Sequence, residues 1–133
     1  MNQSIHDKIM IESRDNMKNE FRQIRIDNIT TLYQIDMGVF FDKPNEVVSD
    51  LLEKLPVIDD LITSNLTNYT IGRLSYFDRA IIRYSIYEVK YLNTPKAIII
   101  NEAIEITKIY TDLDDEKQHK FNNRLLDNIL KDF

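Results

Sequence analysis

The sequence of 133 residues contains no cysteine, so neither a disulfide framework nor a Cys-ligated zinc or iron–sulfur site can form. Its two glycines are too few for the turns of a many-stranded antiparallel sheet and do not make a glycine-rich phosphate loop. The longest aliphatic run, Ala97–Ile100, is far shorter than the ~20 residues of a membrane helix. The N-terminus lacks the apolar segment of a secretory signal. We therefore expect a soluble cytoplasmic protein without a membrane partner.

Positively charged residues are also fewer than negatively charged ones. The chain carries 22 Asp and Glu against 17 Lys and Arg, which gives a formal charge of −5. Phosphate binding usually goes with a basic excess, so this balance argues weakly against a nucleic acid as partner. The length fits one domain.

What the sequence does contain is helical periodicity. Apolar residues recur at steps of three, four and seven over about residues 4–37, which predicts one long amphipathic helix that ends near Gly38. A second apolar face follows, with Asp42 expected as its cap and Pro44 in its first turn. Pro56 removes a backbone donor from this face, which predicts two short helices or one kinked helix.

Three further helices are predicted in the second half. Ser75 is the expected cap of a helix that runs through Leu92 and is apolar nearly all round, as is typical of the centre of a bundle. Thr94 as N-cap and Pro95 in the first turn begin the next helix. The acids expected to open the last helix are Asp112, Asp114, Asp115 and Glu116. The sum is a compact all-α domain of five to seven helices.

The residues that commonly carry catalysis are not arranged for it. His6 and His119 have no partner at the spacing of a metal pair or of a base and nucleophile, so both are interpreted as surface residues. Glu102 and Glu105 are three apart on one helix, but the histidine of the di-iron Glu-x-x-His pattern is missing, which favours a solvated face. We therefore expect no enzyme, no metal and no cofactor, but a helical binding or scaffold module.

A cationic stripe accompanies the first apolar face. Its members recur at steps of three and four: Arg14, Lys18, Arg22 and Arg25. Acids alternate with them on the same helix, so the stripe is either a solvated flank or a surface for phosphates.

Three ordered blocks of the second half resemble the NusB transcription-antitermination family. Residues 73–89, RLSYFDRAIIRYSIYEV, resemble the family signature R-L-S-x-x-D-R-A-I-L-R-x-A-x-Y-E-L. Residues 95–108, PKAIIINEAIEITK, are similar to P-x-K-V-A-I-N-E-A-I-E-L-A-K, and residues 115–127 to D-E-K-x-x-K-F-(V/I)-N-G-V-L-D. In the first half, NITTLYQ at residues 28–34 resembles A-x-x-A-L-Y-Q. The resemblance covers roughly residues 20–130.

The resemblance implies a fold of two small helical bundles packed across each other. Residues 1–18 would be an N-terminal helical extension and residues 19–133 a single NusB-like domain. It also implies a protein without enzymatic activity that binds the boxA segment of ribosomal RNA leader transcripts. It would do so with the ribosomal protein NusE, in an RNA polymerase antitermination complex.

The family's RNA contacts can be assigned where residues match. The arginine-rich start of the first conserved helix corresponds to Arg22 and Arg25, and Arg14 and Lys18 extend it by further turns. In the last helix the resemblance implies RNA contacts at Lys120, Phe121 and Asn123. Phe121 could stack on an unpaired base, whereas the alternative places it in the core, with Asn123 capping or crosslinking helices.

The resemblance also implies a surface that contacts the family's protein partner, and the sequence block that would form it includes Tyr84, Tyr87 and Glu88. Arg79 and Arg83 also match family positions, and a structural role is favoured for them. The carboxylates expected to pair with these arginines are Asp78, Glu102 and Glu105, so the predicted structural ion pairs involve Arg79, Arg83, Glu102 and Glu105.

Two positions depart from the family pattern. Arg124 replaces a glycine, and Asn122 replaces an apolar residue. The arginine cluster of the first helix is also diluted by acids. These departures motivate an alternative function, a degenerate NusB-like interaction scaffold or homodimer without RNA binding. If RNA binding is retained, the acidic balance indicates that it depends on the protein partner.

Overall fold

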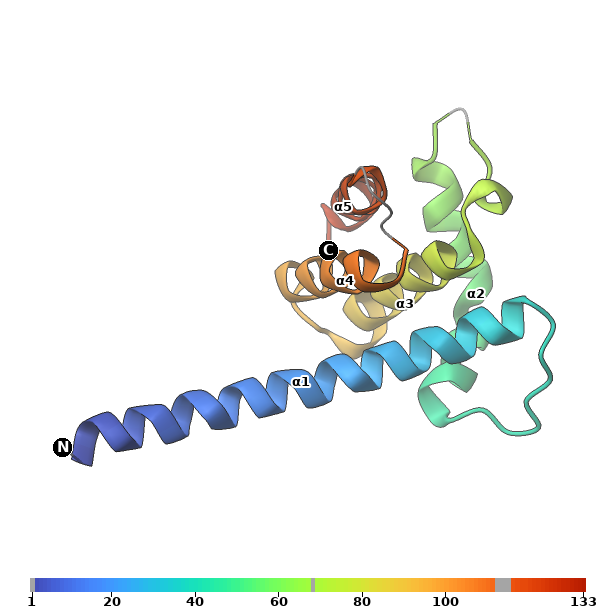
Figure 1. Ribbon diagram of the computed structural model, residues 1–133. Helices are drawn as coiled ribbons and strands as arrows, with labels where there is room; N and C mark the ends of the chain where they lie inside the picture. The colour runs from blue at the N-terminus through green and yellow to red at the C-terminus, as the bar shows by residue number, and fades with distance from the viewer. Residues whose placement is uncertain (1, 68, 112–115) are drawn as a thin grey trace.

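The computed structural model describes residues 2–67, 69–111 and 116–133; the side chains of residues 2–4, 6 and 9–15 lie outside this description. Five α-helices and one short 3-10 helix make up the described part of the chain (Figure 1). In order they are α1 (Asn2–Asp36), α2 (Glu46–Asn65), η1 (Ile71–Arg73), α3 (Tyr76–Leu92), α4 (Lys96–Tyr110) and α5 (Lys117–Leu130). The prediction of an all-α domain is confirmed.

Helix α3 is the centre of the molecule. All four other α-helices pack against it, with α1 and α2 forming one group around it and α4 and α5 the other. Its side chains are buried on every side, including Ile81, Ile82 and Ile86. A helix that is apolar nearly all round can only be stable when it is enclosed in this way, so the predicted central position is confirmed.

Helix α1 is a single helix of 35 residues, but its two halves have different surroundings. The C-terminal half packs along α3 and buries Ile29 and Leu32, whereas the N-terminal half extends away from the body (Figure 1). Met17 and Phe21 are therefore exposed, although the helical periodicity of the sequence places them on the same apolar face as the buried residues. The expected boundary between the N-terminal extension and the NusB-like domain, between residues 18 and 19, falls inside this continuous helix.

Helix α2 differs from the prediction at its start and in its middle. Its N-cap is Asn45 rather than Asp42; the Asn45 side chain accepts the Val48 N–H at 2.9 Å and donates to Asn28 of α1 at 2.8 Å. Pro44 precedes the helix instead of lying in its first turn. Pro56 is exposed, and one helix continues through it because Ile58 carries on the buried stripe against the core.

The N-termini of the remaining helices show which capping predictions from the local sequence were correct. Ser75 caps α3 as predicted, accepting the Asp78 N–H at 3.1 Å. Thr94 does not cap α4, because its hydroxyl donates instead to Glu88 at 2.9 Å, and Pro95 occupies the N-cap position. Three acids expected to open α5, at positions 112, 114 and 115, lie outside the described residues. Glu116 is the N-cap residue of α5 but makes no side-chain capping bond.

Candidate RNA-binding and partner surfaces

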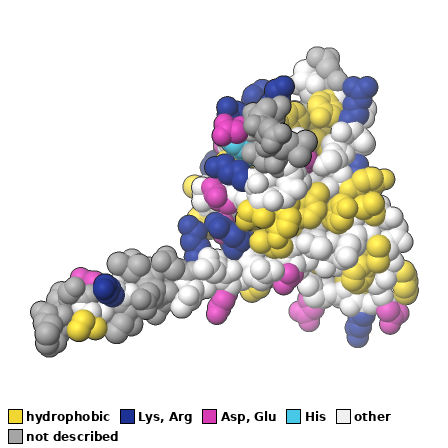
Figure 2. All heavy atoms as spheres, viewed as in Figure 1, with side chains coloured by type: hydrophobic (Ala, Val, Ile, Leu, Met, Phe, Trp, Pro, Cys, Tyr) yellow, Lys and Arg dark blue, Asp and Glu magenta, His cyan; other side chains and the backbone are white. Residues whose placement is uncertain are grey.

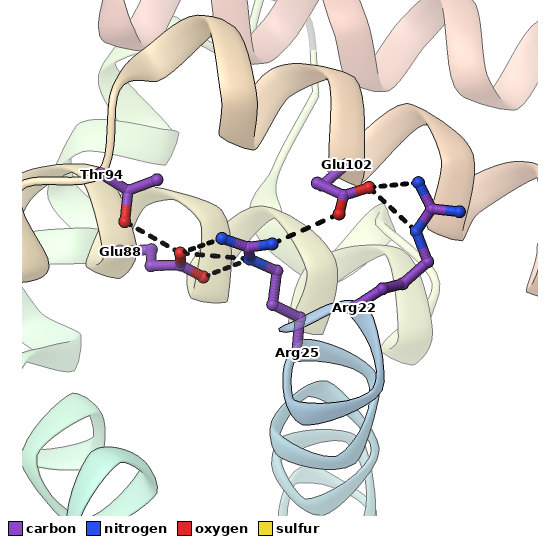
Figure 3. Close-up of polar contacts among 5 residues, drawn as sticks. All are labelled: Arg22, Arg25, Glu88, Thr94 and Glu102. Atoms are coloured by element: carbon purple, nitrogen blue, oxygen red, sulfur yellow. Dashed lines mark hydrogen bonds and ion pairs between the residues drawn. The ribbon is translucent and has the colours of Figure 1, made fainter. Parts of the chain in front are cut away.

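Two arginines predicted to bind RNA, Arg22 and Arg25, are held by buried glutamates (Figure 3). Arg25 lies 2.9 Å through Nε and 2.7 Å through Nη2 from the two carboxylate oxygens of Glu88. Its Nη1 is 3.3 Å from Glu102, and the Nε of Arg22 is 2.9 Å from the other oxygen of Glu102. The network therefore joins α1 to both α3 and α4.

The two glutamates of this network are nearly inaccessible to solvent. Glu88 is 5% and Glu102 3% exposed, and the Thr94 hydroxyl gives Glu88 one more hydrogen bond. The hydrogen bonds that Arg25 donates to the Glu88 carboxylate raise the pKa of Arg25 above its ordinary value, so this guanidinium remains charged. Two guanidinium groups balance two carboxylates here, which leaves little net positive charge for a phosphate.

The interpretation of Glu102 as part of a solvated face is wrong, because α1 crosses α4 and covers it. Glu105 is partly exposed, and within the described part of the chain its ion pair is with Lys108 of its own helix, at 3.6 Å. Glu102 thus links helices through Arg22 and Arg25 rather than through the expected Arg79 or Arg83, and Glu105 forms no interhelical ion pair among the described residues.

One more member of the cationic stripe, Lys18, borders a groove between α1 and α4. Lys18 is exposed there, while the side chain of Arg14 lies outside the described residues. The groove has a volume of about 680 Å³, and its walls include Met17 and Phe21 of α1 and Ile98 of α4. It is mainly apolar because the exposed half of the α1 stripe faces it.

Arg79 and Arg83 form structural ion pairs, but with other acids than expected. Arg79 lies 2.6 Å from Asp36 at the end of α1, and Arg83 makes two contacts of 2.9 Å with Asp59 of α2. Arg83 also lies 3.4 Å from Asp36. The expected partners are engaged elsewhere: Asp78 with Ser75, Thr111 and Asn122, and Glu102 with α1. The arginines therefore tie α3 to α1 and α2.

The α5 residues predicted to contact RNA occupy a separate surface. Figure 1 shows α1 and α5 on opposite sides of α3 and α4, so the structure does not unite the two predicted halves. Lys120 is exposed and lies 3.7 Å from Glu116. Phe121 is half-buried and packs against Tyr69, with ring centroids 5.5 Å apart. Asn123 is half-buried and makes no side-chain hydrogen bond among the described residues.

The asparagine that links helices is Asn122 rather than Asn123. It is completely buried, and its amide donates to Asp78 of α3 and to Thr107 of α4, both at 3.1 Å. The departure from an apolar family residue thus fills a polar core position in which every hydrogen-bonding group is satisfied.

The residues expected to face the protein partner are buried, and the prediction that they form a surface is wrong in this structure. Tyr84, Tyr87 and Glu88 are 3%, 2% and 5% exposed. Burial raises the pKa of Tyr84, and it raises the pKa of Tyr87 to about 12. Tyr87 donates a 2.7 Å hydrogen bond to Asp50, which lowers the pKa of that carboxyl.

A different group of aromatic side chains reaches the surface, where Tyr110 is 51% exposed and Tyr33 and Phe77 are partly buried, and sequence reasoning missed it. The rings of Tyr33, Phe77 and Tyr110 come from α1, α3 and α4 and stand in a row with successive centroids 5.3 Å apart. Figure 2 shows hydrophobic side chains gathered over this meeting point of the three helices. We call these three residues the aromatic face. No local pattern could have revealed it, because its members are far apart in the sequence.

The described residues offer no group of three His, Cys, Asp or Glu that could hold a metal ion. Within the same residues, no helix has both the length and the apolar character required to span a bilayer.

The described elements define an all-helical protein in which four α-helices pack around a central one. The NusB family model matches residues 7–131 of the chain. The match begins within the predicted extension. The chain belongs to the NusB family: it is a NusB-like transcription antitermination protein and not an enzyme.

Curated relatives agree with this assignment. Transcription antitermination protein NusB of Listeria monocytogenes serotype 4a (strain HCC23) is 37% identical over 123 residues, covering 89% of this chain and 93% of the relative. The NusB protein of Staphylococcus aureus (strain MRSA252) is 33% identical over 129 residues, covering 83% and 98%.

Solved structures share the fold. T. maritima NusB superposes with a TM-score of 0.71 at 28% identity, covering 84% of this chain and 90% of that one. A chain of a crystal structure described as a plectonemic RNA supercoil also reaches 0.71, at 22% identity, covering 83% and 93%, and shows likeness of fold alone.

Proposed function

We propose that this protein acts in the cytoplasm, binding boxA-type segments of ribosomal RNA leader transcripts together with the ribosomal protein NusE in an RNA polymerase antitermination complex. The observation that carries this proposal is the match to the NusB family over residues 7–131, nearly the whole chain. The surfaces described above support two separate parts of it, a protein contact and an RNA contact.

The aromatic face is the surface that best suits NusE. Tyr110 is 51% exposed, and the neighbouring Ile109 is also exposed, so apolar area remains open beside the three packed rings. Rigid aromatic anchors lose little conformational entropy on binding and dominate many protein interfaces. Tyr84 and Tyr87 are 3% and 2% exposed, so they cannot contact a partner directly.

The charges support RNA binding that depends on the partner. The net charge is −5, and the arginines of α1 are neutralised by Glu88 and Glu102. Among the described residues, cations without a carboxylate partner include Lys18 of α1 on one side of the molecule and Arg124 of α5 on the other. Binding to RNA by the protein alone is therefore weak, and the partner adds contacts that it lacks.

The test is a binding titration with a boxA RNA, with and without NusE, at several salt concentrations. We expect weak binding alone, tighter binding with NusE, and a linear fall of log K with log salt in both cases. Binding that ignores salt, or that NusE does not improve, would overturn the proposal.

The alternative, a scaffold or homodimer without RNA binding, is favoured by the pairing of Arg22 and Arg25 with buried acids. Replacing these arginines would disturb the fold, so the discriminating variant is the exposed Lys18→Gln combined with Lys120→Gln. Absence of RNA binding by the wild type with or without NusE, together with a dimeric mass in sedimentation, would support the alternative, whereas weaker RNA binding by the variant than by the wild type would contradict it.

A further inference from the structure

Arg22 is held less firmly by its carboxylate partner than Arg25 is (Figure 3). Its Nε and Nη2 atoms both donate to a single oxygen, Oε2 of Glu102. Arg25 instead spans both oxygens of Glu88, through Nε and Nη2. Because a fork that engages two oxygens makes the stronger contact, Arg22 is the guanidinium of this network that can leave more easily.

The two arginines also differ in their access to solvent. The side chain of Arg22 is 24% exposed, and that of Arg25 is 11% exposed. The Nη1 atom of Arg22 makes no hydrogen bond among the described residues. Lys18 precedes Arg22 by one helical turn, is exposed, and has no carboxylate partner within the described part of the chain. A phosphate that approaches Lys18 therefore also approaches the open side of Arg22.

Glu102 has a second positive neighbour that stays when Arg22 leaves. Its Oε1 lies 3.3 Å from Nη1 of Arg25, which Glu88 already holds in place. A buried carboxylate that loses every counter-charge strongly destabilises a fold, but Glu102 would keep one. Release of Arg25 would be different, because Glu88 would lose its ion-pair partner among the described residues. The network therefore permits the exchange of Arg22 and opposes that of Arg25.

We propose that Glu102 competes with RNA for Arg22. In the free protein Glu102 masks this guanidinium, and in the RNA complex a phosphate takes the place of the carboxylate while Arg25 remains the counter-charge of Glu102. The proposal rests on the proposed function and adds the regulation of its RNA surface. The free energy needed to separate Arg22 from Glu102 is subtracted from that of RNA binding, so Glu102 sets how tightly the chain binds RNA.

The experiment measures boxA RNA binding to the full chain, alone and with NusE, over a salt series. Glu102→Gln keeps the size of the side chain and an acceptor oxygen but removes the charge that holds Arg22. Glu105→Gln is the matched control, because it removes the same charge from the same helix at a carboxylate that is 40% exposed and pairs with Lys108. Circular dichroism establishes that each variant is folded.

We expect Glu102→Gln to tighten RNA binding about threefold relative to Glu105→Gln, the size expected for a partly exposed ion pair. The salt slope should steepen by about 0.7, which corresponds to one more phosphate contact on a single strand. Adding Arg22→Gln to Glu102→Gln should abolish both gains. A purely structural role of Glu102 predicts instead that the substitution lowers stability and leaves RNA binding unchanged or weaker.

A measurement on the wild type does not depend on the folding of any variant. The Nε–H groups of Arg22 and Arg25 both donate to carboxylates, and NMR can follow each of them during a titration with boxA RNA in the presence of NusE. We expect the Arg22 signal to shift as its acceptor changes from carboxylate to phosphate. The Arg25 signal should keep its position, because its fork on Glu88 persists.

Failure of the proposal can be told apart from failure of the proposed function. If the wild type binds RNA with NusE, but the Arg22 signal does not move or Glu102→Gln matches Glu105→Gln in affinity and slope, the role of Glu102 is overturned and the proposed function stands. If the wild type binds no RNA with or without NusE, both are overturned.

Discussion

Arg25 of α1 and Glu88 of α3 form a two-pronged ion pair, in which Nε and Nη2 of the guanidinium lie 2.9 and 2.7 Å from the two carboxylate oxygens. The two residues are 63 positions apart in the chain. Each is close to fully buried, with side-chain exposures of 11% and 6%. An arginine that the sequence analysis predicted to bind RNA is thus part of an ion pair that holds two helices together.

Replacing Arg25 by alanine should destabilise the protein by about 3–5 kcal/mol, because Glu88 would remain buried without its counter-charge. Urea unfolding followed by circular dichroism measures this change. Lys18→Ala on the exposed part of the same helix is the control and should shift the free energy of unfolding by less than about 0.5 kcal/mol. Equal effects of the two substitutions would contradict the structural role of Arg25.

Restoring the family's apolar residue with Asn122→Val should destabilise the protein by about 1–3 kcal/mol, since Asp78 and Thr107 would lose a buried donor. Asn123→Val carries the same cost in helix propensity but breaks no side-chain hydrogen bond among the described residues, so it is the matched control. A stabilising effect of Asn122→Val in thermal unfolding would show that the polar link is dispensable.

Removing the exposed ring of the aromatic face with Tyr110→Ala should weaken NusE binding by about 2 kcal/mol, or roughly 30-fold, if this residue is an interface anchor. Isothermal titration calorimetry with NusE tests this. Leu92→Ala removes a comparably exposed apolar side chain outside the aromatic face and should bind as the wild type does. Unchanged affinity of Tyr110→Ala would place the NusE contact elsewhere.

Alkaline pH should destabilise the fold through Tyr87. Its pKa is raised from an ordinary value near 10 to about 12, mainly by burial and then by its hydrogen bond to Asp50. The folded state therefore holds this proton more tightly than the unfolded state. The resulting stability is complete below pH 10 and is lost as the pH rises through 12.

A titration of tyrosinate absorbance checks this expectation. Burial also raises the pKa of Tyr84, so two of the seven tyrosines should ionise only above the range of exposed tyrosine. Tyr87→Phe should remove one of these late steps. If all seven tyrosines ionise together near pH 10 in the folded protein, the burial of Tyr84 and Tyr87 is contradicted.

Features that depend on neighbouring residues were predictable. The period of the apolar residues located the helices, and the Ser75 cap follows from a hydroxyl three residues before an acid. The all-round apolar pattern correctly put α3 in the centre. Thr94 shows the limit of such signals, because its hydroxyl has a better acceptor in Glu88, which no capping rule considers.

Which charged and aromatic side chains are buried, paired or exposed depended on how the helices cross. Spacing along α1 shows that Arg22 and Arg25 share a face, but not that α3 and α4 present Glu88 and Glu102 to that face. The aromatic face likewise exists because three helix ends meet. The sequence alone therefore determined where the helices lie, that the fold is all-α and which family the motifs resemble, because each of these depends on residues within a few helical turns of one another. Which arginines remain free for RNA is settled by long-range packing, because a buried carboxylate captures whichever guanidinium the crossing brings to it.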